Sequence, residues 1–162
     1  MTSGVPSKAQ RYKQPVSVLV VIHTPDLRVL LLERADFPGH WQSVTGSRND
    51  DESLDETAAR EVAEETGIVA ALHGGVVDWK MTNRFEIFTR WRHRFAPGTT
   101  HNTEHVYSLA VATEVPVRLA PREHLSFAWW PWQDAAARCF SWSNRDAILA
   151  LPAQIATAAK RR

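Results

Sequence analysis

Apolar residues in the first part of the chain gather in short runs that polar turns separate. Val16–Ile22 and Val29–Leu32 are rich in valine, isoleucine and leucine, and Pro25, followed by an aspartate, lies between them. Such runs favour strands and the Pro-Asp pair favours a turn, so the two segments predict a β-hairpin. Trp41–Thr45 predicts a further short strand that ends at Gly46.

A helical period replaces this pattern over residues 53–66. Leu54, Ala58 and Val62 recur every four residues and would form one buried stripe along a helix. The segment opens with a serine that has a glutamate three residues later, which is the signature of a capping box. Gly67 follows the last helical position, where a left-handed residue commonly ends a helix.

Strand-like patterns dominate the second half of the chain. They occur near residues 68–72, 76–81, 85–95, 104–113 and 127–130. Residues 85–95 alternate most clearly, and they would place Arg90, Arg92 and Arg94 together on one face of a strand. Such a row could bind phosphates or the end of an RNA, but it is more often a solvated face or paired with nearby acids.

The two ends of the chain complete the predicted organisation. Residues 1–10 are small and polar and are expected to form a flexible arm before a single domain, 11–162. A terminal helix is predicted from Ser143, and Pro152 is expected to interrupt it. The order of elements indicates an α+β or α/β domain with a mixed sheet.

Composition narrows the possible settings for this domain. The chain has 162 residues, a net charge of +1 and one cysteine, Cys139. The balanced charge gives no argument for a nucleic-acid partner, and a lone cysteine cannot form an internal disulfide. Val16–Ile22 follows basic residues but is far too short to span a bilayer. We therefore expect a cytoplasmic protein without a membrane partner.

The predicted helix carries a cluster of acids that disfavours the helix itself. Glu61 and Glu65 lie four residues apart, and Glu64 borders the same side. Like charges at this spacing cost about 0.2–0.5 kcal/mol per pair, and the helix dipole disfavours anions in the last turn. A divalent cation would remove this conflict, because Mg²⁺ prefers oxygen ligands. The carboxylates alone are explained equally well by a solvated acidic face.

The spacing around these acids is more specific. Gly46 is followed after five residues by Glu52, and after seven more by the run Arg60-Glu61-Val62-Ala63-Glu64-Glu65-Thr66-Gly67-Ile68. This frame resembles the box of the Nudix hydrolases at seven fixed and two apolar positions. The resemblance implies an α/β/α sandwich with a mixed sheet and a catalytic loop–helix–loop. It also implies Mg²⁺, for which Mn²⁺ can substitute, held by Glu61, Glu64 and Glu65, with Gly46 contributing its backbone.

Further stretches across about residues 11–146 resemble one branch of that family, the bacterial dihydroneopterin triphosphate diphosphatases. The resemblance lies in segments such as Lys13–Ser17, Trp41–Gly46, Phe85–Phe88 and Ser141–Arg145. It implies hydrolysis of a pterin triphosphate to its monophosphate and pyrophosphate, a step of folate biosynthesis. It also implies Glu123 as a metal ligand beside Glu61 and Glu65. The implied substrate contacts are Lys13, Arg34, Thr45, Phe85, Glu86, Ile87, Phe88 and Ser141.

The roles of individual residues remain open at this level. Glu64 or Glu123 would accept the proton from water, and Arg60 is expected to orient Glu64 by a charge-assisted bond. His124 is set aside as structural. Glu86 beside flanking phenylalanines suits a pterin ring, although core packing also explains the phenylalanines.

Two rival functions share the same box. A house-cleaning nucleoside triphosphate pyrophosphatase or an RNA 5′-end pyrophosphohydrolase would differ only in the pocket. A catalytically silent Nudix domain would bind a nucleotide as a regulator, but such domains usually lose box glutamates, and this chain retains all of them. The expected partner is therefore a small triphosphate; the sequence does not indicate an oligomeric state.

Overall fold

A seven-stranded mixed sheet forms the centre of the protein. The computed structural model describes residues 12–160, so the predicted arm at 1–10 lies outside the described residues. The strands are β1 (Val16–His23), β2 (Arg28–Arg34), β3 (Trp41–Gln42), β4 (Val44–Ser47), β5 (Val77–Glu86), β6 (His101–Ala110) and β7 (His124–Pro131). The order is β3-β2-β1-β6-β5, with β4 paired to β1 and β7 to β2. β1 and β6 run parallel, and the other named pairs are antiparallel.

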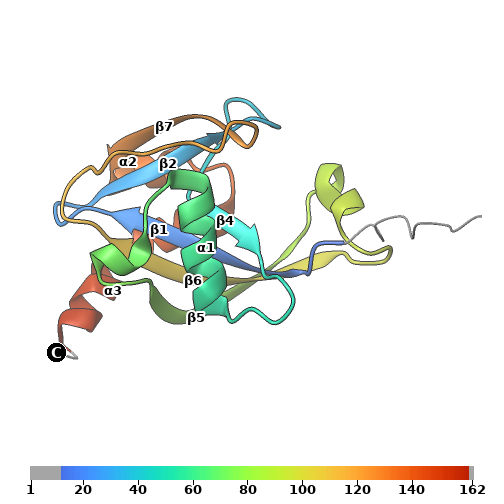
Figure 1. Cartoon of the computed structure of the whole chain (residues 1–162), viewed down its shortest axis with the longest axis horizontal. Coiled ribbons are helices and arrows are strands. Elements are labelled where there is room, and N and C mark those ends of the chain that lie inside the picture. The colour runs from blue at the N-terminus through green and yellow to red at the C-terminus, as the bar shows by residue number, and fades with distance from the viewer. Residues whose placement is uncertain (1–11, 161–162) are drawn as a thin grey trace, which may run out of the picture.

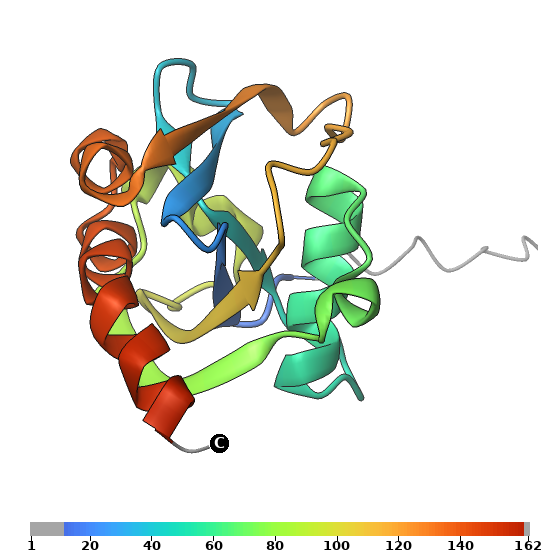
Figure 2. The same cartoon turned by 90° about the vertical axis from the view of Figure 1, so that its left-hand side faces the viewer.

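Helices cover both faces of this sheet and give the predicted α/β/α sandwich. The helical elements are α1 (Leu54–Thr66), the 3₁₀ helices η1 (Ala70–His73) and η2 (Thr89–Arg94), α2 (Trp132–Arg138) and α3 (Trp142–Lys160). Figure 2 shows α1 on one side of the sheet, and α2 and α3 on the other. η2 lies at one end of the molecule, close to where the chain enters β1 (Figure 1).

The central strand β1 supplies both layers of the core. Val18 and Val20 pack in the cluster that includes residues of α1, whereas Leu19 and Val21 pack in the cluster that includes residues of α2 and α3. A strand covered on both faces needs a continuous apolar run, which explains the sequence Val16–Ile22. The predicted pairing of β1 with β2 is confirmed, and its register places His23 opposite Val29.

The local signals for α1 are confirmed in detail. The backbone N–H of Glu56 donates to Ser53 Oγ at 3.1 Å, and the N–H of Ser53 donates to a Glu56 carboxylate oxygen at 3.4 Å. Gly67 ends the helix with φ 74°, in the left-handed region. Ala58 and Val62 are fully buried, so the apolar side of α1 is anchored in the core and its acidic side is held rigidly.

The strand predicted at Trp41–Thr45 is present but interrupted. β3 and β4 are separated at Ser43, whose N–H donates to Asn144 Oδ1 at 2.7 Å. The Nδ2 of Asn144 in turn donates to Ser43 Oγ at 2.9 Å. An asparagine from α3 therefore takes the place of a strand partner at this residue.

Several predicted elements are wrong. Residues 68–72 form a short loop and the first residues of η1 instead of a strand, and residues 85–95 contain the end of β5 followed by η2. The row Arg90, Arg92 and Arg94 therefore does not share a strand face. η2 is bent back by contacts to a loop distant in sequence, including a bond from Trp91 Nε1 to Asp36 at 3.0 Å.

The C-terminal region differs from its prediction in two ways. α2 was not predicted; it is seven residues long and has no side-chain cap bond, so it carries little local signal. α3 continues through Pro152 to Lys160, because Ile148 and Leu151 remain packed in the core on the preceding turn. Within residues 12–160, no helix combines the length and apolar character needed to cross a membrane.

Candidate active site

A cleft of about 1410 Å³ brings together residues from both ends of the domain. It is lined by parts of α1, β4, the end of β5, the start of β6, and the segments that precede β7 and begin α3. The predicted site residues that line it are Lys13, Arg34, Thr45, Glu61, Glu64, Glu65, Phe85, Glu86, Ile87, Phe88, Glu123 and Ser141. Of the predicted set only Arg60 does not line the cleft.

Glu61 lies closely against the backbone of β4. A Cβ added to Gly46 would be 2.0 Å from Glu61 Cδ, so only glycine leaves room for this carboxylate. The Glu61 side chain is 12% exposed, and burial raises its pKa to about 7. Arg60 opposes this rise by donating from Nη1 to Glu61 Oε1 at 2.7 Å.

Glu65 is the most enclosed acid of the group. Burial raises its pKa well above the usual range, and the charges of Glu61 and Glu123 raise it further. The backbone N–H of Thr45 donates to its carboxylate at 3.2 Å. Glu65, Glu123 and His124 present ligand atoms that all lie within 4.8 Å of one another.

His124 was set aside in the sequence analysis, but its position is close to the acids. Its Nε2 is 3.9 Å from Glu65 Oε1, and burial lowers its pKa to about 4, so the ring is neutral near pH 7. Its buried Nδ1 has no hydrogen-bond partner among residues 12–160. Nothing in the sequence indicates that His124 lies beside Glu65, because the two residues come together only when the sheet folds.

Arg60 holds the acidic helix and the preceding loop together. It donates from Nε and Nη2 to both oxygens of Glu52, at 2.6 and 2.9 Å, and lowers the pKa of Glu52 to about 2. Its Nη1 also donates to Glu64 at 3.2 Å, which agrees with the predicted orienting role. The same loop contains Asp51, whose φ of 63° lies in the left-handed region that glycine favours.

The acids of this site suit a divalent cation. The carboxylates of Glu65 and Glu123 and the neutral imidazole of His124 present ligand atoms to one another. Burial raises the pKa values of Glu61 and Glu65, and the charges of neighbouring glutamates raise them further. Oxygen-rich groups of this kind are typical ligands of hard divalent cations. A cation would offset the repulsion that the protein alone leaves uncompensated.

Basic groups line the same cleft as the acids. Arg34 donates from Nε and Nη2 to the two oxygens of Asp36 at 2.7 and 2.8 Å, and its guanidinium stacks on Trp91 at 4.3 Å. Arg94 also donates to Asp36 at 3.0 Å. Enclosure in the cleft and the nearby Arg94 lower the pKa of Lys13. Asp36, which the sequence analysis missed, therefore orients cationic groups that can meet a phosphate chain.

An aromatic wall lies beside these basic groups. Phe88, Trp91 and Phe140 line the cleft, and their ring centroids are 5.4 to 6.1 Å apart. Arg90 stacks on Phe37 at 3.8 Å behind this wall. Phe88 remains about half exposed, so a flat ring can reach it from the cleft.

The other predicted contact residues occupy different parts of the same cleft. Phe85 is half-buried, Ile87 is buried, and the Glu86 carboxylate is bonded to Arg92. Ser141 also caps α3, because its Oγ accepts a hydrogen bond from the backbone N–H of Asn144 at 3.2 Å. The cap of α3 is therefore provided by Ser141 and not by the predicted Ser143.

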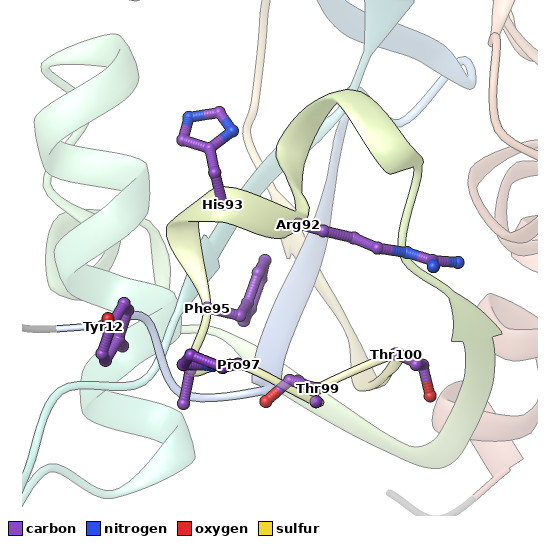
Figure 3. Close-up of a pocket in the computed structure, with 9 residues that line it drawn as sticks. Tyr12, Arg92, His93, Phe95, Pro97, Thr99 and Thr100 are labelled. Carbon is purple, nitrogen blue, oxygen red and sulfur yellow. The ribbon is translucent and has the colours of Figure 1, made fainter.

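A second, smaller pocket lies outside this arrangement. It has a volume of about 410 Å³ and is formed by the end of η2 and the loop that follows. Figure 3 shows Tyr12, Phe95 and Pro97 along it, with Arg92 and His93 pointing in different directions. Within the described part of the chain, no carboxylate lines this pocket.

Comparison with known proteins agrees with this geometry. The sequence pattern of the NUDIX domain matches residues 13–151. The chain belongs to the Nudix family. Dihydroneopterin triphosphate diphosphatase of Escherichia coli K12 is 48% identical over 143 residues, which cover 87% of this chain and 94% of the relative. The enzyme of that name from Haemophilus influenzae is 40% identical over 141 residues, covering 85% of this chain and 87% of that protein.

A solved Nudix structure has the same architecture. The E. coli dihydroneopterin triphosphate pyrophosphohydrolase superposes with a TM-score of 0.80 at 47% identity. The match covers 85% of this chain and 94% of that one. The predicted fold class and family are thus both confirmed, and Nudix hydrolases generally use a divalent metal, as the acidic cluster suggests.

Proposed function

We propose that this Nudix hydrolase uses Mg²⁺ to cleave dihydroneopterin triphosphate into dihydroneopterin monophosphate and pyrophosphate. The observation that carries the proposal is a single cleft lined by carboxylates, by cations and by an aromatic wall. It occurs in a chain that is 48% identical to a dihydroneopterin triphosphate diphosphatase over almost its whole length. Each part of the cleft matches one part of such a substrate.

Glu61, Glu65 and Glu123 would hold the metal ions, and Mn²⁺ is expected to replace Mg²⁺. When bound, such an ion activates water and stabilises charge on the transferring phosphoryl group. Gly46 allows Glu61 its place against β4, and the Thr45 N–H fixes Glu65. The acids are therefore held by a strand and a helix that are both anchored in the core.

Glu64 is the group that accepts the proton from water in this proposal. Its side chain is 55% exposed in the cleft, and Arg60 directs it through the bond at 3.2 Å. Glu123 is less suited, because its carboxylate shares the ligand group with Glu65 and His124. Arg60 thus acts as a positioning residue for Glu64 and Glu61.

Lys13 and Arg34 would neutralise the triphosphate, since placed cations stabilise charge that develops during phosphoryl transfer. The Phe85–Phe88 segment and Ser141 line the part of the cleft where the ring would lie. Aromatic rings prefer offset or edge-to-face contacts at 4.5–7 Å between centroids, and the wall of Phe88, Trp91 and Phe140 offers such faces.

The decisive experiment is a product analysis with Mg²⁺ on dihydroneopterin triphosphate and the common deoxynucleoside triphosphates at equal concentration. We expect rapid pyrophosphate release from the pterin and slow release from the nucleotides. Equal or faster turnover of nucleotides would reject the pterin assignment and leave a house-cleaning pyrophosphatase.

Two variants test the metal ligands in the same assay. Glu61→Gln and Glu65→Gln are expected to lower kcat by at least about 100-fold, with the far-ultraviolet circular dichroism unchanged. Glu114→Gln is the matched control, because Glu114 is paired with Arg28 and does not line the cleft. Near-wild-type turnover of either variant would remove that residue from the metal site.

A further inference from the structure

Two polar side chains on β6 lie in the wall of the cleft, away from the acidic helix. Asn102 and Glu104 are two residues apart, so they project from the same face of the strand. Both line the cleft, yet they are only 6% and 5% exposed. Val106, the next residue on that face, packs in the core cluster that includes residues of α2 and α3. The pair therefore lies where the core ends and the cleft begins.

Both side chains present an acceptor that the folded chain leaves unused. Within residues 12–160, Asn102 Oδ1 and Glu104 Oε1 have no hydrogen-bond partner. The orientation of Asn102 is fixed, because its Nδ2 donates to Ser17 Oγ at 2.7 Å. Buried polar atoms nearly always have a partner, and leaving one without a partner destabilises the folded protein. Two such atoms on one face of a strand that lines the cleft indicate a ligand that supplies donors.

The charge of Glu104 gives the same indication. Burial raises its pKa to about 7, although side-chain hydrogen bonds from Ser143 and Asn83 to the carboxylate oppose the rise and leave Oε1 as its free acceptor. Among residues 12–160, no basic side chain forms an ion pair with Glu104. By contrast Glu86, the carboxylate that the sequence suggested for the pterin, is 67% exposed and already bonded to Arg92. Glu104 is the carboxylate with free accepting capacity.

We propose that Glu104, assisted by Asn102, accepts hydrogen bonds from the amino group and adjacent ring N–H of the substrate's heterocycle. The inference rests on the proposed function of this cleft and names the residues that choose the ring. A carboxylate accepts two parallel bonds when two donors lie side by side. A 2-amino-4-oxopyrimidine ring, present in pterins and in guanine, has such a pair. Adenine and cytosine place an acceptor beside the amino group, and thymine has a single N–H between two carbonyls.

The distinguishing test measures kcat/KM for dihydroneopterin triphosphate, dGTP and dATP with the wild-type enzyme and Glu104→Gln. All three substrates carry the same triphosphate, so changes in metal binding affect them alike. Glutamine is isosteric but places a donor against one of the two substrate donors. We expect kcat/KM to fall about 10- to 100-fold for the pterin and dGTP, as for loss of a hydrogen bond to a charged group, and to stay unchanged for dATP.

Controls separate recognition from damage to the fold. Glu114→Gln makes the same chemical change outside the cleft and should leave all three values unchanged. Glu104→Asp keeps the charge but withdraws it by one methylene, so it should cause a smaller loss with the same pattern. Circular dichroism and thermal melting of each variant show whether it is folded.

The outcomes also distinguish this inference from the proposed function. If the wild-type enzyme ignores the pterin but prefers dGTP to dATP, and Glu104→Gln abolishes that preference, the proposed function fails and the inference stands. If Glu104→Gln lowers all three values equally, or changes none, Glu104 does not select the ring and the inference is overturned.

Discussion

Replacing Gly46 with alanine tests the site through a single added methyl group. Its Cβ would lie 2.0 Å from Glu61 Cδ and 2.2 Å from Glu61 Oε1. Nonpolar contacts are favourable at about 3.5–4.0 Å, so the carboxylate must move by about 1.5 Å or more. The strand cannot give way easily, because Gly46 is paired with Val18 of β1. The flexible end of Glu61 therefore moves, and its bond to Arg60 at 2.7 Å is lost.

Such a movement should affect turnover far more than folding. A displacement of about 1 Å at a reacting centre can cost about 100-fold in rate. We expect Gly46→Ala to lose about 100-fold in kcat and to need more Mg²⁺ for half-maximal rate. Its melting temperature should fall only slightly, because the displaced group is a side-chain end.

A second glycine provides the opposite control. Gly74 has φ 90°, and a Cβ there would meet nothing within 4 Å, so Gly74→Ala strains the backbone without touching the cleft. This variant should lose about 1 kcal/mol of stability and keep wild-type turnover. Pyrophosphate release and thermal melting measured on both proteins give the comparison. If Gly46→Ala retains kcat within about threefold of wild type, the assignment of Glu61 to the metal site is refuted.

Three further predictions follow from the same geometry. Asp36→Asn should release η2 and raise KM about tenfold, because Asp36 accepts bonds from Arg34, Trp91 and Arg94. The direct readout is faster tryptic cleavage at Arg90, Arg92 and Arg94. Unchanged cleavage would mean that Asp36 does not hold this segment. The pKa of Glu104 rises on folding from 4.5 to about 7, so ionisation of Glu104 destabilises the folded state as the pH rises through this range. In urea unfolding, the stability advantage of Glu104→Gln over wild type should therefore grow by about 2 kcal/mol between pH 5 and pH 8. A difference in stability that stays constant with pH would contradict this prediction. Chelation of the metal by EDTA should abolish turnover. Millimolar Mg²⁺ should raise the melting temperature by about 3–8 °C, because a bound cation relieves the repulsion between Glu61 and Glu65. An unchanged melting temperature would argue against a metal site.

The sequence predicts well what short-range signals determine. α1 could be predicted because its cap, apolar stripe and terminal glycine all lie within residues 53–67. The acids could be predicted for the same reason, since spacing on one helix places Glu61, Glu64 and Glu65 together. The paired role of Arg60 also follows from positions on or next to that helix.

The remainder depends on contacts between distant segments. η2 has the alternating pattern of a strand, but bonds from Arg90, Trp91 and Arg94 to Asp36, more than fifty residues earlier, hold it in a helical turn. His124 could not be placed beside Glu65 without the register of β7 on β2. Glu104 was missed because its missing partner is visible only once the surrounding side chains are positioned.

The parallel pairing of β1 with β6 also has a consequence for how the chain reaches this state. Val16 pairs with Thr103 and His23 with Ala110, so the centre of the sheet joins segments that are 87 residues apart in the sequence. Such non-local contacts slow folding, because a long loop must close before the pairing contributes. During synthesis, α1 leaves the ribosome well before β6 is made, and until then the edge of β1 that pairs with β6 has no partner strand. The catalytic helix therefore gains its supporting sheet late, which makes this interval the one most exposed to aggregation.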